Sequence, residues 1–479
     1  MAATAPDSAD WETLPTEISL SILKQLPDLT TLYNYITSSP AAARVFDTYA
    51  AEIVESHLAS GAVHTYTGAI IRLTAYVRSG VRPPGVSDFD DFNNLYVHET
   101  TEHRYELAQW TEEPLRLTQQ QSVADGTQAG ISASVLRSVL ASHRRNERLM
   151  AGCLTMYLPR FRALQPQWVA DREFTFESIY HGPDHTDFVG AWQMQPATVP
   201  VPKRDLGPPT WCEEQRLLRA AWRIQLYEDM KTAAIGGRFL DHWPENVLRK
   251  LQRDNPTLLM WVELDCLIAV HDYELDIHHQ LIDVEDELIN TVLDYIDSIR
   301  EMIGPSFSLA SDALLQHIPD RDWPVPTSSP RDILEVEWYT SAMNLEFQAV
   351  HGSEMDHVTE DECTPLQHVP WDFYRRRGFA IWSEQRLLGY GLIPPGSCFK
   401  ISDDPVAAMT PDEHYSASML FMAWKSVLVE QELAEVDRVN QIRQEECMRP
   451  PPVTLTGIIS CLERNVTPDI YRMTPKITE

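Results

Sequence analysis

The sequence predicts a mainly α-helical protein, in which a short N-terminal three-helix module precedes a large, irregular helical domain. Apolar residues recur at helical spacing between proline-rich breaks over most of the chain. The breaks themselves are predicted to be loops or linkers, because proline cannot join the centre of a β-ladder. A chain of 479 residues that is 43% hydrophobic and contains 13 Trp can bury a large core.

The N-terminal module begins with a helix that Pro15 is suited to start, because its missing N–H would be unpaired in a first helical turn. Pro27 ends this helix, and Asp28 is placed to cap a second one. Ser39 and Pro40 start a third. The apolar positions of the first two helices are Leu14, Ile18, Ile22, Leu23, Leu26, Leu29, Leu32, Tyr33 and Ile36. A unit of this size buries little of its own surface and is expected to dock on a partner.

The order of these residues resembles the F-box, whose pattern Leu-Pro-x-Glu-Ile/Leu-x-x-x-Ile-Leu-x-x-Leu precedes a Pro-Asp break and a leucine-rich helix. The match covers residues 14–58. The resemblance implies docking on a Skp-family adaptor and, through it, on a cullin, as in an SCF-type ubiquitin ligase. The adaptor contacts that it implies are Leu14, Pro15, Ile18, Ile22, Leu23, Leu26, Pro27, Leu29 and Leu32.

Two further motifs resemble stretches of fungal F-box proteins that have helical bodies and no named repeats. The first comprises Arg216, Arg219, Ala220, Trp222 and Arg223, and the second comprises Gly378, Phe379, Ile381, Trp382, Arg386 and Leu387. In the first, the arginines are expected on a different helix face from the apolar residues. Both motifs are expected to pack in the core, and neither names a target.

The proline-rich breaks predict the division of the chain. The predicted segments are a disordered tail at 1–12, the F-box-like module at 13–59, a helical region at 60–193, a Pro-rich linker at 194–210, a main helical domain at 211–448 with loops at 319–330 and 393–411, and a C-terminal segment at 449–479.

Residues 261–302 predict one or two long amphipathic helices with an acidic outer face, since twelve acidic residues there are opposed only by Arg300. Ile268, Leu275, Ile282, Ile289 and Ile296 recur at every seventh position. A solvated face is the plain interpretation. The alternative is that this face attracts a basic partner segment.

The candidates for chemistry are few. His279 and Asp283, four residues apart and close to His271, Asp276 and His278, could share a metal ion, but no complete ligand pattern is present. The chain has no Gly-x-Ser-x-Gly elbow, phosphate loop, dinucleotide fingerprint or Cys-x-x-Cys motif. We therefore predict no catalytic residue, no metal and no cofactor.

Charge and cysteine content limit the partners and the compartment. The formal charge of −31 disfavours nucleic-acid binding, which depends on a basic surface. Seven scattered cysteines are typical of reduced intracellular thiols, and neither a signal peptide nor a membrane-spanning run is recognised. We expect a protein of the cytoplasm, the nucleus or both, without membrane partners.

The hypothesis is a non-catalytic substrate receptor of an SCF-type ubiquitin ligase, whose helical body binds a protein target at a site that the sequence leaves unknown. One alternative is a scaffold protein whose F-box-like start packs on its own body. The other is a metal-dependent enzyme that uses the His/Asp-rich helix. Burial of Ile18, Ile22 and Leu23 beneath residues 60–160 would favour the scaffold.

Overall fold

The structure is a computed structural model that describes only part of the chain and is mainly helical there, as predicted. The described residues are 14–86, 91–92, 95, 115–118, 121–122, 128–174, 195–236, 276–303, 316, 318–319, 321, 323–324, 366, 369, 371–394 and 411–447. The chain divides into two compact units, residues 1–427 and 428–479, which are treated separately.

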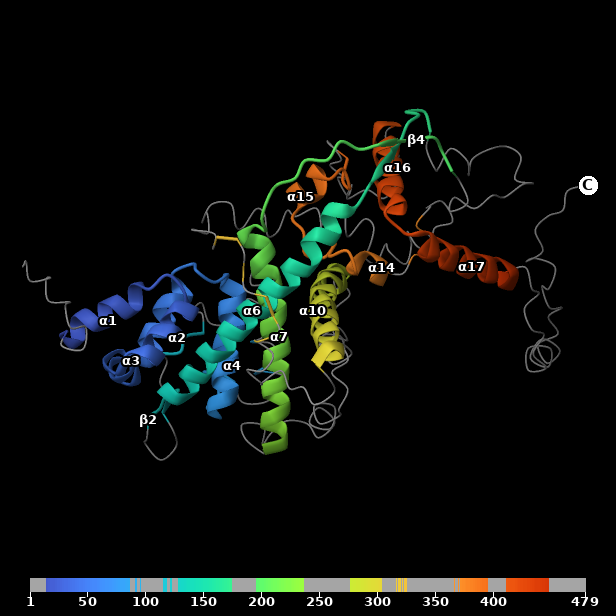
Figure 1. Cartoon of the computed structure of the whole chain (residues 1–479). Coiled ribbons are helices and arrows are strands. Elements are labelled where there is room, and N and C mark those ends of the chain that lie inside the picture. The colour runs from blue at the N-terminus through green and yellow to red at the C-terminus, as the bar shows by residue number, and fades with distance from the viewer. Residues whose placement is uncertain are drawn as a thin grey trace, which may run out of the picture. The chain divides into compact units, whose positions relative to one another are not determined.

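The N-terminal module forms the three helices that the proline and capping residues predict (Figure 1). They are α1 (Thr16–Gln25), α2 (Leu29–Ser38) and α3 (Pro40–Ala59). Asp28 caps α2 by accepting a hydrogen bond from the backbone N–H of Thr31 at 2.6 Å. Ser39 caps α3 in the same way, accepting from Ala42 at 3.2 Å. Both α1 and α2 pack on α3.

The body of the first unit is built around α7 (Trp211–Gly236), which packs against three other long helices (Figure 1). These are α4 (Thr65–Ser79), α6 (Ala133–Ala163) and α10 (Asp276–Ile303). Helix α6 also packs against α2 and α3, so it joins the N-terminal module to the body. Helices from the predicted segments 13–59, 60–193 and 211–448 thus pack together, and the segment boundaries stay predictions.

Short antiparallel strands pair at two places: β1 (Gln121–Ser122) with β2 (Gln128–Ala129), and β3 (Gln167–Val169) with β4 (Thr198–Pro200). The prediction that the Pro-rich segment 194–210 contains no strand is therefore wrong at β4. A two-stranded ladder has only edges, so the N–H that Pro200 lacks can face away from the partner strand. The ladder is extended by the N–H of Val201, which donates to the carbonyl of Pro166 at 3.2 Å.

The C-terminal part of the first unit contributes α14 (Trp371–Arg375), α15 (Glu384–Gly389) and α16 (Pro411–Ser426), of which α16 packs on β3. Helix α17 (Glu430–Cys447) belongs to the second unit. Of the loops predicted at 319–330 and 393–411, most residues lie outside the described part of the chain, as do the tail at 1–12 and the segment 449–479.

The acidic amphipathic helix is confirmed where its side chains are described, from Leu288 to Met302 of α10. Ile289, Val292 and Ile296 are buried there, whereas Asp294 and Asp297 are exposed. Residues 261–275, which the same prediction covered, are not described. In the described part of the chain, no helix combines the length and the apolar character needed to cross a membrane.

Candidate functional site

The residues predicted to bind an adaptor separate into an outer and an inner set. Ile18 is 50% exposed, Pro15 and Pro27 are exposed, and Leu14, Ile22 and Leu26 are partly buried. Ile18 and Ile22, four residues apart, lie on one side of α1, whereas Leu14 and Leu26 come just before and just after the helix. We call these four the outer stripe. Leu23, Leu29 and Leu32 are fully buried and support the stripe from within the module.

The inner side of α1 is held by α3. His57 of α3, only 1% exposed, has its Nε2 2.7 Å from the carbonyl oxygen of Leu23, to which it donates. Burial lowers the pKa of His57, although this hydrogen bond opposes the shift.

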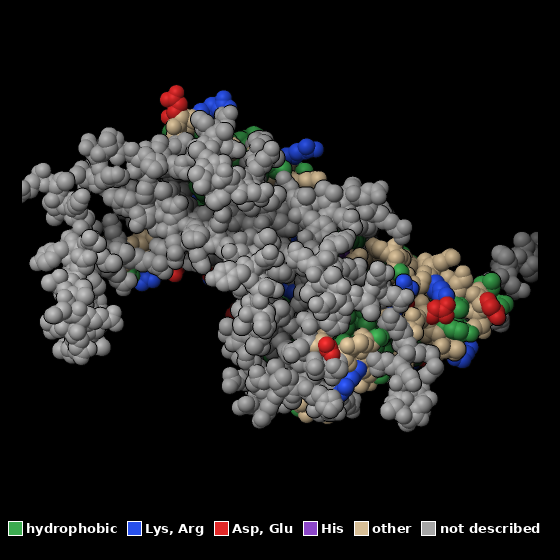
Figure 2. Space-filling view, turned by 180° about the vertical axis from the view of Figure 1, so that it is seen from behind, with side chains coloured by type: hydrophobic (Ala, Val, Ile, Leu, Met, Phe, Trp, Pro, Cys, Tyr) green, Lys and Arg blue, Asp and Glu red, His purple; other side chains and the backbone are tan. Residues whose placement is uncertain are grey.

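Hydrophobic side chains lie between charged ones on the surface of the N-terminal helices (Figure 2).

The module is fixed to the body by polar contacts at several points. Glu55 of α3 accepts from Nε and Nη2 of Arg72 on α4, with distances down to 2.6 Å, and also from the backbone N–H of Leu117 at 3.0 Å. The Arg137 guanidinium on α6 pairs with Asp47 at 2.7 Å. These contacts lie away from α1. The module is therefore attached to the body through α3 and also through α2, which packs on α6, and none of these polar contacts involves a residue of the outer stripe.

Burial of Ile18, Ile22 and Leu23 beneath residues 60–160 would favour the scaffold alternative. Only Leu23 is buried, and the contact at its carbonyl comes from His57, inside the module. The condition set for that alternative is not met.

An open pocket of about 370 Å³ lies where α2, α3 and α6 meet. Its lining residues are Tyr33, Ile36, Thr37, Ala43, Arg137 and Ser138. Because Arg137 is already paired with Asp47 and also donates to the carbonyl of Ala43 at 3.2 Å, the pocket offers no unpaired charge to an ion.

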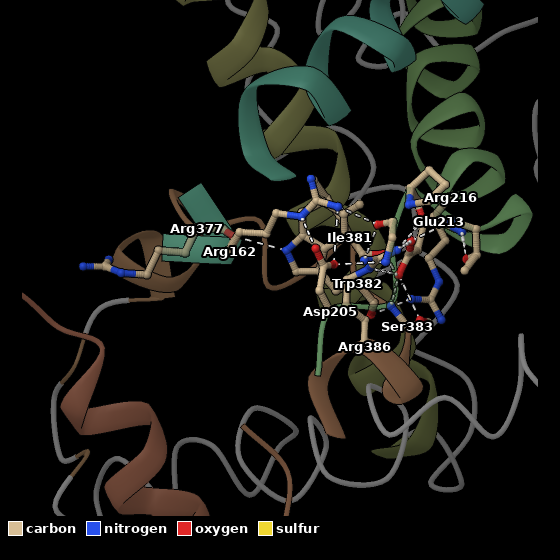
Figure 3. Close-up of polar contacts among 12 residues, drawn as sticks. Arg162, Asp205, Glu213, Arg216, Arg377, Ile381, Trp382, Ser383 and Arg386 are labelled. Carbon is tan, nitrogen blue, oxygen red and sulfur yellow. Dashed lines mark hydrogen bonds and ion pairs between the residues drawn. The ribbon is translucent and has the colours of Figure 1, made fainter. Parts of the chain in front are cut away.

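A polar cluster is buried where α7 meets the segment from Ile381 to Arg386 (Figure 3). Glu213 and Arg386, both with side chains 0% exposed, are joined by Arg386 Nε at 2.8 Å and Nη2 at 2.9 Å. Ser383 donates to the same carboxylate from its N–H at 3.0 Å and its hydroxyl at 2.9 Å. We call Glu213, Ser383 and Arg386 the Glu213 cluster.

Local sequence explains why Glu213 occupies this position. Thr210 and Glu213 form a reciprocal capping box at the start of α7: the Glu213 carboxylate accepts from the Thr210 N–H at 2.8 Å, and the Thr210 hydroxyl accepts from the Glu213 N–H at 3.3 Å. Burial alone would raise the pKa of Glu213, but the hydrogen bonds and charge of Arg386 outweigh it and hold that pKa below its ordinary value.

The two motifs that the sequence singled out meet at this cluster. Arg216 of α7 donates to the carbonyls of Ile381 and Trp382 at 3.2 and 2.9 Å. The Trp382 ring packs against Phe161 with centroids 5.2 Å apart. The expectation that both motifs pack in the core is thus met by direct contact between them. The cluster is closed and its charges are matched, so its role is structural.

The arginines of the first motif lie on a buried face of α7. The sequence predicted that Arg216, Arg219 and Arg223 occupy a face distinct from the apolar one, within a motif that packs in the core. All three are buried, with residue exposures of 5%, 5% and 8%. Helix α7 is enclosed by α4, α6 and α10, so even its polar face packs against protein. Arg219, for example, lies 5.1 Å from the centre of the Tyr66 ring.

Sequence reasoning missed a second buried cluster, around His143 of α6. The indole Nε1–H of Trp222 donates to His143 Nδ1 at 3.3 Å, and His143 Nε2 lies 3.4 Å from Glu147 Oε1. The hydroxyl of Thr30 on α2 donates to the other oxygen of Glu147. The i,i+4 spacing of His143 and Glu147 was the available signal. His143 is 1% exposed and the Glu147 side chain 29% exposed, and the cluster joins α2, α6 and α7.

Among residues whose placement is described, no three His, Cys, Asp or Glu side chains are arranged to hold a metal ion. The side chains of the predicted His/Asp-rich stretch, His271 to Asp283, lie outside that part. Cys153 and Cys212 are buried free thiols, and burial raises the pKa of Cys153.

Comparison with known proteins gave no relative. No family model matches the chain, and neither a curated protein nor a solved structure is significantly similar to it.

Proposed function

We propose that this protein is a substrate receptor of an SCF-type ubiquitin ligase, and that it docks on a Skp-family adaptor through the outer stripe of α1. The single observation that carries the proposal is the exposure of Ile18 on a helix whose other side is held by α3. Its position within the F-box-like sequence gives the partner's class.

The physical argument is that an apolar stripe on a short amphipathic helix gains free energy when a partner groove covers it. Ile18 is the most exposed member of the stripe, Ile22 lies one helical turn from it, and Leu14 and Leu26 lie just beyond the two ends of α1. A few such central side chains normally supply most of the energy of a helix interface. The buried residues Leu23, Leu29 and Leu32 would shape this surface without touching the partner.

In this role the chain performs no chemistry. Its mechanism is proximity: a target held on the body is brought to a ubiquitin-charged enzyme that the adaptor and a cullin position, which raises the effective concentration of the target's lysines. The proposed location is the cytoplasm, the nucleus or both.

A scaffold function is the second candidate, because the buried contacts between the module and the body, such as Glu55 with Arg72, would also serve a purely structural N-terminus. In that case α1 would need no adaptor. A substrate receptor would bind a Skp-family adaptor through the outer stripe, whereas a scaffold would not.

The deciding experiment is capture of the full-length chain by an immobilised Skp-family adaptor. Ile18→Asp places a charge at the centre of the stripe and is expected to lower recovery at least about tenfold. Ile235→Asp is the matched control, since Ile235 lies near the end of α7 and is 67% exposed. It is expected to leave recovery unchanged. Leu23→Asp is unsuitable here because Leu23 is fully buried and the substitution would disrupt the module itself.

Thermal unfolding of both variants is measured alongside, to verify that each is folded. Equal recovery of native chain and Ile18→Asp, or no recovery of the native chain, would refute the proposal.

A further inference from the structure

The basic residues of this chain are almost all arginine. Of 39 basic residues, 7 are lysine and 32 are arginine. No lysine occurs between Lys24 and Lys203, although thirteen arginines lie in that interval, and none occurs between Lys250 and Lys400. Long stretches of the protein therefore carry positive charge without a primary amine.

The amines of the described lysines contact neighbouring groups, although Lys203 is exposed and the pair of Lys24 with Glu52 lies at the surface. Lys24 Nζ pairs with Glu52 at 2.5 Å. Lys203 Nζ donates to the carbonyls of Leu164 at 2.8 Å and Arg162 at 3.3 Å, at the end of α6. Lys231 and Lys425 also have interaction partners. Lys250, Lys400 and Lys476 lie outside the described residues.

Structural need explains arginine at buried positions, because its planar guanidinium binds carboxylates and carbonyls at two points. Arg386 and Arg72 use it in that way. The same argument fails at the surface, where exposed ion pairs contribute little and lysine would serve equally. Arg160, Arg204 and Arg376 are such exposed positions. The Arg160 guanidinium makes a long hydrogen bond of 3.4 Å to the carbonyl of Arg376 and lies 5.4 Å from the centre of the Tyr157 ring. Arg376 makes an exposed pair with Asp372 and lies 5.7 Å from the centre of the Phe373 ring. A lysine ammonium can make both kinds of contact.

The two side chains differ in their chemistry toward ubiquitin. A neutral lysine amine attacks the thioester carbonyl at the ubiquitin C-terminus, so that a C–N bond forms and the C–S bond breaks. The enzyme's cysteine sulfur leaves as thiolate, and the proton lost by the nitrogen passes to that sulfur or to water. The guanidinium of arginine stays protonated and is no substitute for the amine.

We propose that the scarcity of lysine limits ubiquitin transfer to this chain itself, so that the receptor survives the reaction it promotes. The inference rests on the proposed function. A receptor is held beside the charged enzyme for as long as it stays in the complex, so its own amines would be present at high effective concentration. An arginine in place of a surface lysine removes the amine to which ubiquitin could be attached and keeps the positive charge.

The test compares three full-length chains, each assembled with adaptor, cullin, ubiquitin and the activating and conjugating enzymes. The chains are the native protein, the triple variant Arg160→Lys, Arg204→Lys and Arg376→Lys, and a control with glutamine at the same three positions. The control loses the charges without gaining an amine.

The rate at which ubiquitin is attached to the receptor is measured by gel electrophoresis, and the sites of attachment are identified by mass spectrometry. The lysine variant is expected to be modified about tenfold faster than the native chain, at the new lysines. The glutamine variant should match the native chain.

Adaptor capture by the same preparations separates the two proposals. If the native chain is not captured, the proposed function fails and this inference fails with it. If all chains are captured and the native chain and the lysine variant are modified at equal rates, high or low, the ligase function can stand and the inference about lysine is overturned.

Discussion

At the scale of single residues, the pair of Glu213 and Arg386 is where a substitution should affect the fold most. Both side chains are completely buried, and Arg386 also donates to the carbonyls of Gly207 and Pro208 at 3.1 and 2.8 Å. A buried ion pair of this kind adds little net stability over apolar residues, but losing one partner leaves the other charge uncompensated.

We predict that Glu213→Ala lowers the free energy of unfolding by about 3–5 kcal/mol, because it leaves the Arg386 guanidinium buried without a carboxylate. Urea denaturation followed by far-UV circular dichroism measures this change.

Asp205→Ala is the control for this prediction, since Asp205 pairs with Arg162 at 3.1 Å and the two side chains are 50% and 38% exposed, whereas those of Glu213 and Arg386 are 0% exposed. It should cost about 0–1 kcal/mol. Similar losses of unfolding free energy in Glu213→Ala and Asp205→Ala would contradict the expectation that the Glu213 pair matters more to stability than the Asp205 pair.

The residues of this cluster were only partly predictable. The sequence singled out Arg216, Trp382 and Arg386 as pieces of recurrent motifs and predicted that they pack in the core. It did not identify Glu213 as the carboxylate that receives Arg386, although Thr210 and Glu213 have capping-box spacing. A pairing across 173 positions of sequence leaves no local periodic signal.

At the scale of elements, the crossing of α6 and α10 depends on a glycine within α6. A Cβ added at Gly152 would collide with the phenol oxygen of Tyr295 on α10 and come within 2.9 Å of Ile318. Both Tyr295 and Ile318 are buried. The helices approach closely there because Gly152 has no side chain.

We predict that Gly152→Ala lowers the free energy of unfolding by about 1–3 kcal/mol, as overpacking does in a filled core. Helix propensity alone predicts the opposite sign, because alanine is favoured over glycine in a helix by about 1 kcal/mol. The free energy of unfolding of Gly152→Ala, measured by thermal or urea denaturation, decides between these two opposite expectations.

The control for this prediction is Gly130→Ala, where an added Cβ meets nothing within 4 Å. It should change stability by no more than about 0.5 kcal/mol. A stabilised Gly152→Ala variant would mean that α6 and α10 do not cross as described.

The three N-terminal helices were predictable because proline and capping residues act locally: Pro15, Pro27 and Pro40 mark where they begin or end, and Asp28 and Ser39 cap them. Which apolar residues remain outside was not predictable. Leu23 and Ile22 are neighbours of similar character, yet only Leu23 is fully buried, since it faces α3.

At the scale of the whole molecule, the chain divides into the units 1–427 and 428–479. The last helix of the first unit, α16, packs on β3, and Trp424 donates its indole N–H to the carbonyl of Leu392 at 2.9 Å. The first unit therefore closes on itself through α16.

We predict that a chain ending at Val427 keeps the urea midpoint of the full-length protein, because it retains every element of the first unit. A chain ending at Pro394 should unfold at lower urea, since it exposes the surfaces that α16 covers, among them Val169 of β3. Tryptophan fluorescence against urea concentration measures both. A lower midpoint for the longer truncated chain would show that the first unit depends on residues beyond Val427.

The sequence alone determined the helical class, the starts and ends of the N-terminal helices and the acidic face of α10, because these follow from spacing and capping over a few residues. Only the tertiary structure decided that the polar face of α7 is buried, that Glu213 meets Arg386, and that Ile18 stays exposed while Leu23 does not. These outcomes depend on which surfaces far apart in the chain come together, and no local pattern encodes that.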